Sequence, residues 1–469
     1  MKRGLSSALV TVALLGAVMG GVGAPLITSV SLELGVALDG AQWTLTITLF
    51  AGAIFAPVLG RLGAGPRRRT SLMVALALVA FGGLLTTIPL PFWALLAGRA
   101  FQGLGVAAVA PLMSVARDHL PAERARSTIA TIAVAGTVGL GVSYPLMGLV
   151  NQLVGLRAAY GVGFLLSVTA VLIAWRAIPN DTPGSAPRID IPGAVLLGLG
   201  MFGVLLVVAQ PSVWDLVWVG SSILAFAVAV LGAWTWLELR TPSPLVDLRL
   251  LATGGVLRAN AAMFAAGIGV YLLFSLLTRF VQAPAEAGYG FGFSGVLAGA
   301  ALIPFSVFGF VAGRLTPWLT ARMSTRWVFA IYAGFVMVAA GLFAIAPDSI
   351  AAMLTSITVL GFGVGGLTAV MPTLVLNGVP QTETSSVLSI NQIVRMIGFS
   401  IGSALAGLLL ATATPSGALF PDKHGYAAAA IYVVPLLGLA AVIILLSPRA
   451  TALARKVNRS RGRGIRQSH

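Results

Sequence analysis

Long apolar stretches, broken by short polar or Gly/Pro-rich segments, run along the whole sequence. A helix of about 20 residues spans the hydrocarbon core of a bilayer and satisfies its own backbone hydrogen bonds, so each stretch predicts a spanning helix. A membrane β-barrel would instead show short alternating strands. The pattern predicts fourteen helices, at residues 7–30, 41–62, 70–91, 92–115, 126–150, 157–178, 190–210, 213–237, 255–283, 292–315, 326–346, 348–371, 385–412 and 424–447.

The basic residues test this count, because positive charge gathers in cytoplasmic loops. With the N-terminus placed in the cytoplasm, most of the 29 basic residues fall in alternate loops and in the tail after Arg449, all on one side. An odd number of helices would break this asymmetry. We therefore predict a multi-pass protein of the plasma (inner) membrane, with both termini cytoplasmic.

The two ends of the sequence resemble each other. Short matches recur in the same order at offsets of 253, 258 and 259 residues. The matched pairs are Gly60-Arg61-Leu62 with Gly313-Arg314-Leu315, Gly103 to Val106 with Gly361 to Val364, and Ser127, Gly139 and Gly148 with Ser386, Gly398 and Gly407. Such an offset is too long for adjacent six-helix halves, so two helices are expected between duplicated halves. Duplicated halves around a central site are common in secondary transporters.

Composition agrees with a membrane protein and excludes several chemistries. The chain is 58% hydrophobic and 9% charged, against roughly a quarter charged residues in soluble domains. It has no cysteine, and its three histidines fall in predicted loops or the tail, so we expect no disulfide, metal site or cofactor. The net charge of +16 is interpreted as a topology signal, with no nucleic acid as partner.

Several segments carry recognisable motifs. Residues 99–105 read R-A-F-Q-G-L-G, residues 60–63 read G-R-L-G ahead of three arginines at 67–69, and residues 136–148 are glycine-rich around Pro145. Gln42-Trp43 opens the second predicted helix, and Asn391 to Arg395 lie in the thirteenth. Together they resemble the major facilitator superfamily, in its fourteen-helix drug:proton antiporter (multidrug efflux) branch. The resemblance implies an all-α membrane fold of two six-helix bundles plus two extra helices.

The resemblance implies a division of the chain into residues 1–180 (first bundle), 181–250 (two linker helices), 251–448 (second bundle) and 449–469 (basic cytoplasmic tail). Three departures alter the expected proton-coupling pattern. Ala64 is found where the family has an Asp after G-R-L-G, and Tyr144-Pro145 is found where the family has a Gly-Pro pair. Gly16 occupies the first-helix position at which proton-coupled relatives carry an Asp.

The thirteen acidic residues fall in predicted loops or at helix ends, and none is predicted in the middle of the membrane. Intramembrane carboxylates and histidines are the usual proton relays, because burial moves their pKa values into the working range. A simple buried-carboxylate antiport mechanism is therefore disfavoured. Glu33, Asp39 or Glu286 at the predicted outer mouth could still exchange protons.

Three arginines fall within predicted spans, where a charge is costly and faces the bundle interior. Arg99 either locks helices through backbone carbonyls or Gln102, which we favour, or tunes a cavity. Arg395 lies one turn beyond Asn391 on the same helical face. This polar face either forms interhelical hydrogen bonds or lines a cavity. Arg279 near a helix end snorkels by default, or attracts an anionic substrate together with Gln282.

Other candidates also have two interpretations. Arg61 and Arg67 to Arg69 form either a cytoplasmic gate, as in the family, or an anchor on anionic lipid. The glycines of the fourth and fifth helices allow a flexible seam or simply tight packing. Aromatic residues either line a cavity or fill the core. The gating candidates are Arg61, Arg67, Arg68, Arg69, Gly103, Gly105, Gly139 and Pro145, and the cavity candidates are Trp43, Phe50, Arg99, Gln102, Tyr144, Tyr271, Asn391 and Arg395.

The sequence favours a secondary transporter that exports hydrophobic or amphipathic compounds, such as drugs, lipids or lipophilic metabolites, by alternating access. Its partners would be that substrate and the membrane lipids, and we expect a monomer. A carrier of another solute or lipid without proton coupling, or a membrane scaffold or sensor, remains an alternative. An enzyme is not expected, because the spans offer no cluster of acids, histidines or nucleophiles.

Overall fold

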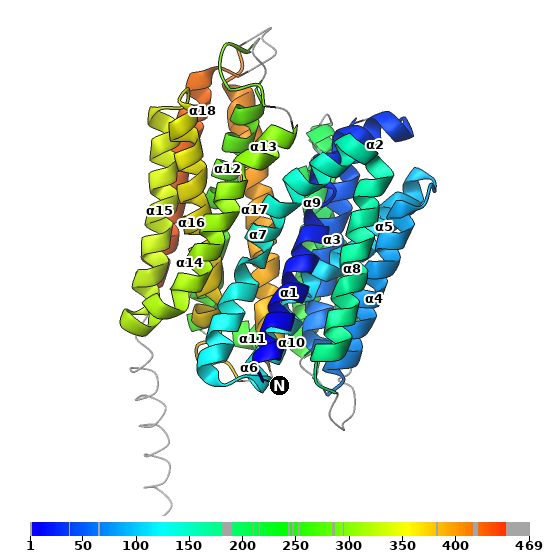
Figure 1. Ribbon diagram of the computed structural model, residues 1–469. Coiled ribbons are helices and arrows are strands. Elements are labelled where there is room, and N and C mark those ends of the chain that lie inside the picture. The colour runs from blue at the N-terminus through cyan, green and yellow to red at the C-terminus, as the bar shows by residue number, and fades with distance from the viewer. Residues whose placement is uncertain are drawn as a thin grey trace, which may run out of the picture.

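In the residues that it describes, the computed structural model consists of α-helices and two short 3-10 helices joined by loops (Figure 1). It describes residues 2–36, 38–63, 66–180, 190–209, 211–214, 216–242, 244–245, 248–251, 254–283, 287–293, 295–380, 383–415 and 421–446. Some predicted features lie outside these residues: the basic tail at 449–469, Ala64, Glu286, and the side chains of Asp39 and Gln42.

The N-terminal group of helices comprises the elements from α1 to α8. They are α1 (Lys2–Gly21), η1 (Ala24–Leu26), α2 (Ile27–Leu34), α3 (Leu38–Gly63), α4 (Arg68–Thr87), α5 (Phe92–Ala107), α6 (Val109–His119), α7 (Ala122–Val154) and α8 (Leu156–Ala177). A linking pair follows, consisting of α9 (Ile191–Ala209), η2 (Pro211–Trp214) and α10 (Val217–Arg240), with the short α11 (Leu248–Leu251) after it.

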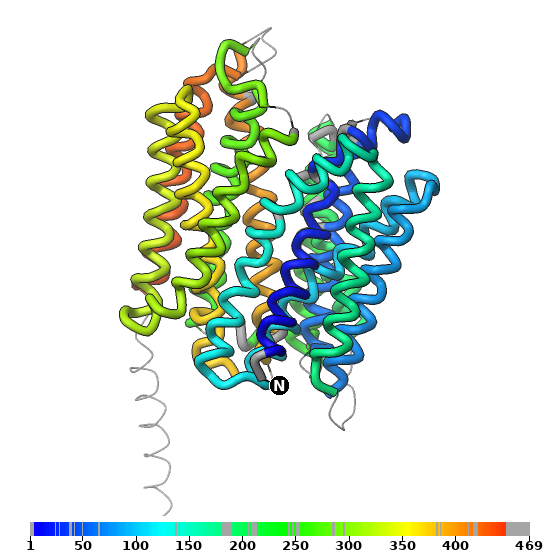
Figure 2. Tube along the Cα trace, in the orientation of Figure 1, coloured from blue at the N-terminus to red at the C-terminus, as the bar shows by residue number. Residues whose placement is uncertain are grey.

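The C-terminal group comprises the elements from α12 to α19. They are α12 (Gly254–Gln282), α13 (Gly295–Ala301), α14 (Ile303–Arg322), α15 (Thr325–Ile345), α16 (Ile350–Val375), α17 (Thr384–Thr412), α18 (Lys423–Ile431) and α19 (Val433–Leu445). Figure 2 shows the blue-to-teal part of the chain on one side and the yellow-to-red part on the other, with α7 and α17 between them.

Each of the predicted apolar runs contains a helix, and in the described residues twelve helices are long and apolar enough to cross a membrane. That set omits α7, which has 33 residues, and α9, which has 19. The chain is therefore an all-helical membrane protein. The charged residues at the helix ends explain why most boundaries differ from the prediction by only a few residues.

Four helices are interrupted where one continuous run was predicted, and a proline explains each interruption. Proline has no N–H, so it leaves the carbonyl four residues earlier without a helical partner. The helix breaks at residues 22–23 before Pro25, at Ala108 before Pro111, at Leu302 before Pro304, and at Tyr432 before Pro435.

The helix packing of the N-terminal group is repeated in the C-terminal group. In the first, α1 packs against α7 and α8, α3 against α5, and α4 against α5 and α8. In the second, α12 packs against α17 and α19, α14 against α16, and α15 against α16 and α19. Each pairing thus has a counterpart in the same chain order. The two groups meet where α7 contacts α14 and α16, and where α17 contacts α3 and α6.

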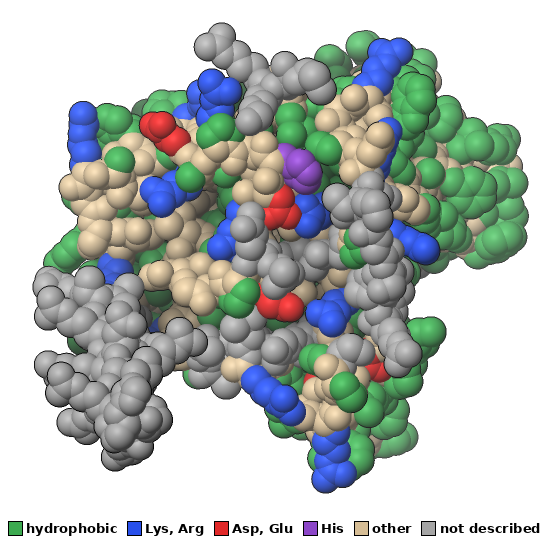
Figure 3. Space-filling model, turned by 90° about the horizontal axis from the view of Figure 1, so that it is seen from below, with side chains coloured by type: hydrophobic (Ala, Val, Ile, Leu, Met, Phe, Trp, Pro, Cys, Tyr) green, Lys and Arg blue, Asp and Glu red, His purple; other side chains and the backbone are tan. Residues whose placement is uncertain are grey.

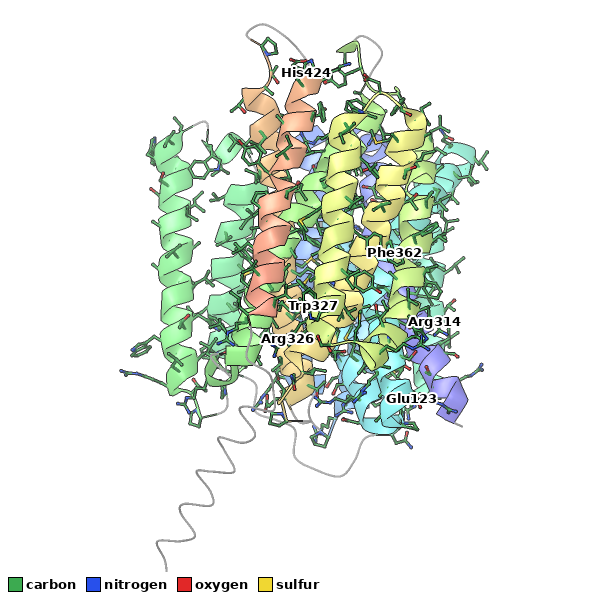
Figure 4. The ribbon with its side chains drawn as sticks, turned by 90° about the vertical axis from the view of Figure 1, so that its left-hand side faces the viewer. Glu123, Arg314, Arg326, Trp327, Phe362 and His424 are labelled. Atoms are coloured by element: carbon green, nitrogen blue, oxygen red, sulfur yellow. The ribbon has the colours of Figure 1, made fainter. Side chains whose placement is uncertain are left out.

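Charged side chains mark one end of the helices, the end at which α1 begins. We call it the basic face and define it by Arg61, Arg67 to Arg69, Arg117 and Arg124; Figure 3 shows Lys and Arg spread over it, with fewer acids. In Figure 4, Glu123, Arg314 and Arg326 lie toward this face and His424 lies at the opposite face. Phe362 lies midway, packed against Tyr332 and Phe335.

Candidate functional site

Arg99 on α5 is completely buried, and its guanidinium donates hydrogen bonds to acceptors on three helices. Nε donates to the Thr44 carbonyl of α3 at 2.9 Å, and Nη1 donates to Gln102 Oε1 at 2.5 Å. Nη1 also donates to the Met19 carbonyl of α1 at 3.2 Å, and Nη2 to the Gly20 carbonyl at 3.3 Å. The guanidinium therefore joins α1, α3 and α5 at one point.

The early end of α1 explains why these acceptors need a donor. The carbonyls of a last helical turn have no partner within their helix, and a positive charge is favourable there. Arg99 supplies both a donor and a charge to the end of α1 at Gly21. Gln102 in turn donates to Thr86 Oγ1 of α4 at 3.4 Å. This geometry supports the structural interpretation of Arg99.

The glycines of α5 and α7 lie where helix backbones approach most closely. A Cβ at Gly103 would lie 2.4 Å from the Thr48 carbonyl oxygen, and one at Gly139 would lie 2.6 Å from Ala17 Cβ. Small residues permit such approaches between membrane helices. These contacts place Gly103 and Gly139 inside the N-terminal group, holding α5 against α3 and α7 against α1.

Gly16 and Gly105 face each other across the contact between α1 and α5. A Cβ at Gly16 would lie only 3.1 Å from the Gly105 carbonyl oxygen. A longer side chain at Gly16 would have to push the two helices apart. The place at which relatives are expected to carry an Asp is therefore occupied by tight backbone packing.

A small cavity lies between the two groups of helices. Its lining comes from α6 and α7 of the N-terminal group and from α12, α16 and α17 of the C-terminal group. The lining residues are Met113, Ala133, Met263, Thr368, Met371, Pro372, Leu388, Asn391, Gln392 and Arg395. Among the predicted cavity residues, Asn391 and Arg395 line it. The chain thus places a charged group in a largely apolar space where its two groups meet.

Asn391 is held in place by a short chain of hydrogen bonds. Its Nδ2 donates to Asn260 Oδ1 of α12 at 3.0 Å, and Asn260 Nδ2 donates to the Val256 carbonyl at 3.0 Å. Both asparagines are buried. Interhelical amide bonds of this kind fix neighbouring membrane helices. One wall of the cavity is therefore rigid.

Three of the predicted aromatic residues are divided between two places. Trp43 and Phe50 on α3 pack against Phe202 on α9, with ring centroids 6.5 and 4.8 Å apart. Tyr271 on α12 stacks on Phe399 of α17 at 5.1 Å. The first set thus packs α3 against the linking pair, and the second lies inside the C-terminal group.

Tyr144 and Pro145 lie where α7 meets α13. A Cβ at Gly299 would lie 3.1 Å from Tyr144 Cβ and from the Pro145 nitrogen. Both predicted residues therefore belong to the contact between the two groups, nearer the opposite face than the cavity is.

Polar contacts cross between the two groups at the basic face. Arg61 Nη1 of α3 lies 3.7 Å from Glu383 Oε1, directly before α17. Arg117 of α6 donates to Thr384 Oγ1 and, at 3.2 Å, to the Val379 carbonyl. Two arginines of the N-terminal group thus contact Val379, Glu383 and Thr384 of the C-terminal group.

The arginines at 67–69 make contacts within the N-terminal group. Arg68 Nη1 pairs with Asp118 Oδ2 at 2.5 Å, and its Nε donates to the Gly63 carbonyl at 2.5 Å. Arg69 donates to Asn180 Oδ1 and, at 2.6 Å, to the Trp175 carbonyl. These two side chains tie α4 to the ends of α3, α6 and α8.

The remaining predicted cations are exposed. Arg67 lies on the basic face, and Arg279 lies near the end of α12 at the opposite face. Gln282, which was expected to act with Arg279, donates to the Thr278 carbonyl of its own helix at 3.0 Å. Exposure of Arg279 fits the snorkelling interpretation.

Sequence reasoning missed most of the cavity. Met113, Met263 and Met371 look like ordinary apolar residues of their helices, and only the fold brings them together. Asn260 carried a usable signal, because an amide in an apolar helix needs a partner inside the protein. Glu383 is equally ordinary in the sequence, since the loop that holds it is opposite Arg61 only after folding.

The two helix groups repeat one packing pattern, enclose a cavity between them and make polar contacts across one end. This architecture is that of a multi-pass membrane transporter. The family model described as Major Facilitator Superfamily matches residues 8–403. The chain belongs to this superfamily, and its family and fold indicate a transporter rather than an enzyme.

Curated relatives include proteins named for antibiotic export and for drug or antibiotic resistance. The chain is 28% identical over 446 residues to the cephamycin export protein CmcT of Amycolatopsis lactamdurans, covering 91% of this chain and 88% of that protein. It is 25% identical to the multidrug resistance protein Stp of Mycobacterium tuberculosis, covering 80% and 69%. It is 27% identical to the methylenomycin A resistance protein of Bacillus subtilis, covering 80% and 81%.

A solved structure shows the same fold. The crystal structure of the human organic anion transporter MFSD10 (TETRAN) superposes with a TM-score of 0.67 at 13% sequence identity. The match covers 94% of this chain and 99% of that one.

Proposed function

We propose that the protein is a secondary transporter that exports hydrophobic or amphipathic compounds by alternating access, acting as a monomer. The observation that carries the proposal is the mostly apolar cavity at the junction of the two helix groups. Ligand sites of secondary transporters lie at such repeat interfaces. The names of the relatives, which include an antibiotic export protein and drug resistance proteins, support the direction and the substrate class.

The proposed membrane arrangement has fourteen spans. Besides the twelve long apolar helices, α7 and α9 have the length needed to cross a bilayer. The repeated packing supports bundles at 1–180 and 251–448, with the linking helices at 181–250 between them. The concentration of arginine at the basic face supports a cytoplasmic location for that face and for both termini.

In this arrangement the basic-face contacts act as the cytoplasmic gate. Arg61 with Glu383, and Arg117 with the segment from 379 to 384, hold the two groups together below the cavity. Their separation would open the cavity to the cytoplasm. The opposite movement would expose it to the outer side, which is the rocking motion of duplicated transporters.

The energy source of transport is proposed not to involve a buried carboxylate. In the part of the chain that the structure describes, the acidic residues lie at helix ends or in loops. Buried Glu238, near the end of α10, accepts a hydrogen bond from the Leu245 N–H at 3.1 Å. Gly16 is packed against Gly105, so no proton-binding group occupies the site expected from the resemblance. This favours the alternative of a carrier without proton coupling.

The test is transport by the full chain in proteoliposomes, with a cationic dye, a fluorescent lipid and an amphipathic drug as probes. Each probe is measured with and without an imposed pH gradient. Movement of at least one probe above protein-free liposomes is expected, at a rate independent of the gradient. No movement of any probe would overturn the export proposal, and a rate that follows the gradient would overturn the uncoupled mechanism.

A further inference from the structure

The two arginines in the interior of the protein have opposite environments. Arg99 donates hydrogen bonds to four acceptors. The Nε of Arg395 is buried and has no hydrogen-bond partner among the described residues. A buried ionised group without a partner is costly, so it is retained where something else compensates it. Arg395 therefore has unused capacity to bind an anion, whereas each nitrogen of the Arg99 guanidinium is already engaged.

The surroundings of Arg395 contain no compensating negative charge. Neither Asp nor Glu occurs among the described residues that line the cavity. Glu383, the acidic residue nearest in sequence, is engaged with Arg61 at the basic face. An unneutralised guanidinium in a low-dielectric space attracts anions more strongly than a surface arginine does.

The remaining lining suits an apolar body attached to an anionic head. Met113, Met263 and Met371 supply flexible and polarisable walls from three helices. Asn391 stands one turn before Arg395 on α17, held by Asn260, and offers a fixed amide beside the charge. The cavity thus combines one cation and two amides, those of Asn391 and Gln392, with adaptable apolar surface.

Two features beside the cavity lie one turn beyond its lining residues on α17 and α7. The Arg395 guanidinium carbon lies 5.8 Å from the centroid of the Phe399 ring, which stacks on Tyr271. On α7, Gly136 lies one turn beyond Ala133, and nothing lies within 4 Å of the place that a Cβ would occupy. Phe399 is therefore an aromatic neighbour of the Arg395 guanidinium, and Gly136 leaves the α7 side of this contact without a side chain.

We propose that the cavity binds amphipathic organic anions, with a carboxylate or sulfonate on the Arg395 guanidinium and an apolar body against the methionines. The inference rests on the proposed transport function and specifies its substrate class. An arginine binds such a head through charge-assisted, often bidentate, hydrogen bonds. A neutral or cationic analogue with the same body would leave the guanidinium unpaired.

The test compares three fluorescent probes with related bodies on the full chain in lipid nanodiscs. They are N-dansylleucine, which is anionic, its neutral methyl ester, and dansylcadaverine, which is cationic. We expect the wild type to bind N-dansylleucine at least about tenfold more tightly than the ester, as one charge-assisted contact allows. Arg395→Gln should remove this preference and still bind the ester. Arg395→Lys should retain part of it, because the charge remains without the planar fork.

Arg314→Gln serves as a matched control, since that arginine is exposed at the basic end of α14, and it should leave the preference unchanged. Equal affinity of the wild type for acid and ester would overturn the proposal. Loss of the preference in Arg279→Gln instead of Arg395→Gln would also overturn it. If Arg395→Gln fails to fold, a Lys variant with undiminished preference for the acid counts against the bidentate contact.

Transport of the same probes separates this inference from the export proposal. Wild-type protein that moves dansylcadaverine and shows no preference for the carboxylate supports export and overturns the anion site. Protein that prefers the carboxylate in binding and moves none of the probes supports the anion site and overturns export.

Discussion

At the scale of single residues, the role of an intramembrane arginine depends on the acceptors around it. The sequence predicted that Arg99 faces the bundle interior and locks helices, because the charge could go nowhere else. It could not predict the Met19, Gly20 and Thr44 carbonyls, since these become acceptors only where α1 ends and α3 passes alongside. Side-chain chemistry is visible in sequence, but the backbone partners of a side chain are not.

Replacing Arg99 tests the structural role. Arg99→Leu should lower the thermal stability of the detergent-solubilised protein, because the Gly20 carbonyl and Gln102 Oε1 lose the donor that Arg99 supplies, at about 1–3 kcal/mol for each buried acceptor left unpaired. The stability of Arg99→Lys should fall between those of the wild type and Arg99→Leu, because lysine has fewer donors in a less suitable geometry. The melting temperature, followed by light scattering, measures the effect, and Arg279→Leu is the control because Arg279 is exposed. A stable but inactive Arg99→Leu protein would contradict the structural role and point to transport.

At the scale of helices, prolines and glycines shape the elements in opposite ways. Prolines interrupt four helices that the hydropathy pattern predicted as continuous. Pro57, Pro145, Pro317 and Pro372 lie inside helices that continue past them. Glycines bring helices together, at Gly103 against α3 and Gly139 against α1. The glycine content of these helices was visible in the sequence. Only the fold shows which helices the glycines contact, and therefore that they serve close packing at these positions.

A methyl group at Gly139 tests the packing between α7 and α1. Gly139→Ala would place its Cβ 2.6 Å from Ala17 Cβ and 2.7 Å from the Ala17 carbonyl carbon, so the two helices must separate. We expect a loss of about 1–3 kcal/mol, as for overpacked cores, seen as a lower melting temperature. Gly334→Ala on α15 is the matched control, because nothing lies within 4 Å of its added Cβ. Equal melting temperatures for the two variants would show that the α1–α7 contact yields easily.

At the scale of the whole molecule, two repeated groups meet around a cavity and are held together at the basic face. The order and approximate position of the apolar helices could be predicted, because lipid imposes length and hydropathy on every spanning segment. The cavity could not, because Met113, Met371 and Leu388 come from three helices whose neighbours are fixed only by packing. The duplication was visible as matched offsets, and the packing repeats it pair by pair.

The basic-face contacts should control access to the cavity. Glu383→Gln removes a partly exposed ion pair worth at most about 1 kcal/mol, which corresponds to a several-fold shift in population. Because the chain has no cysteine, Ala133→Cys provides a single label site in the cavity wall. Maleimide labelling from the side of the basic face, in membrane vesicles, should accelerate several-fold when Glu383→Gln is added.

Asp348→Asn provides the matched comparison for this labelling. It removes the 2.7 Å ion pair with Lys423 at the opposite face, within the C-terminal group, and should leave the rate unchanged. Labelling that accelerates equally in both variants would indicate general loosening rather than a gate. A rate unaffected by Glu383→Gln would assign the closure to the remaining contacts, chiefly those of Arg117.

The pairing of Arg61 with Glu383 has a consequence for the evolution of the family. The superfamily pattern places an acid directly after G-R-L-G, where this chain has Ala64, and here the carboxylate beside Arg61 comes from the other half of the chain. Positions 64 and 383 then become alternative sources of one negative charge. Among homologous sequences the two positions should covary, with an acid at one position more often than at both. The sequence of each homologue would then indicate which half of the chain supplies the carboxylate that pairs with Arg61.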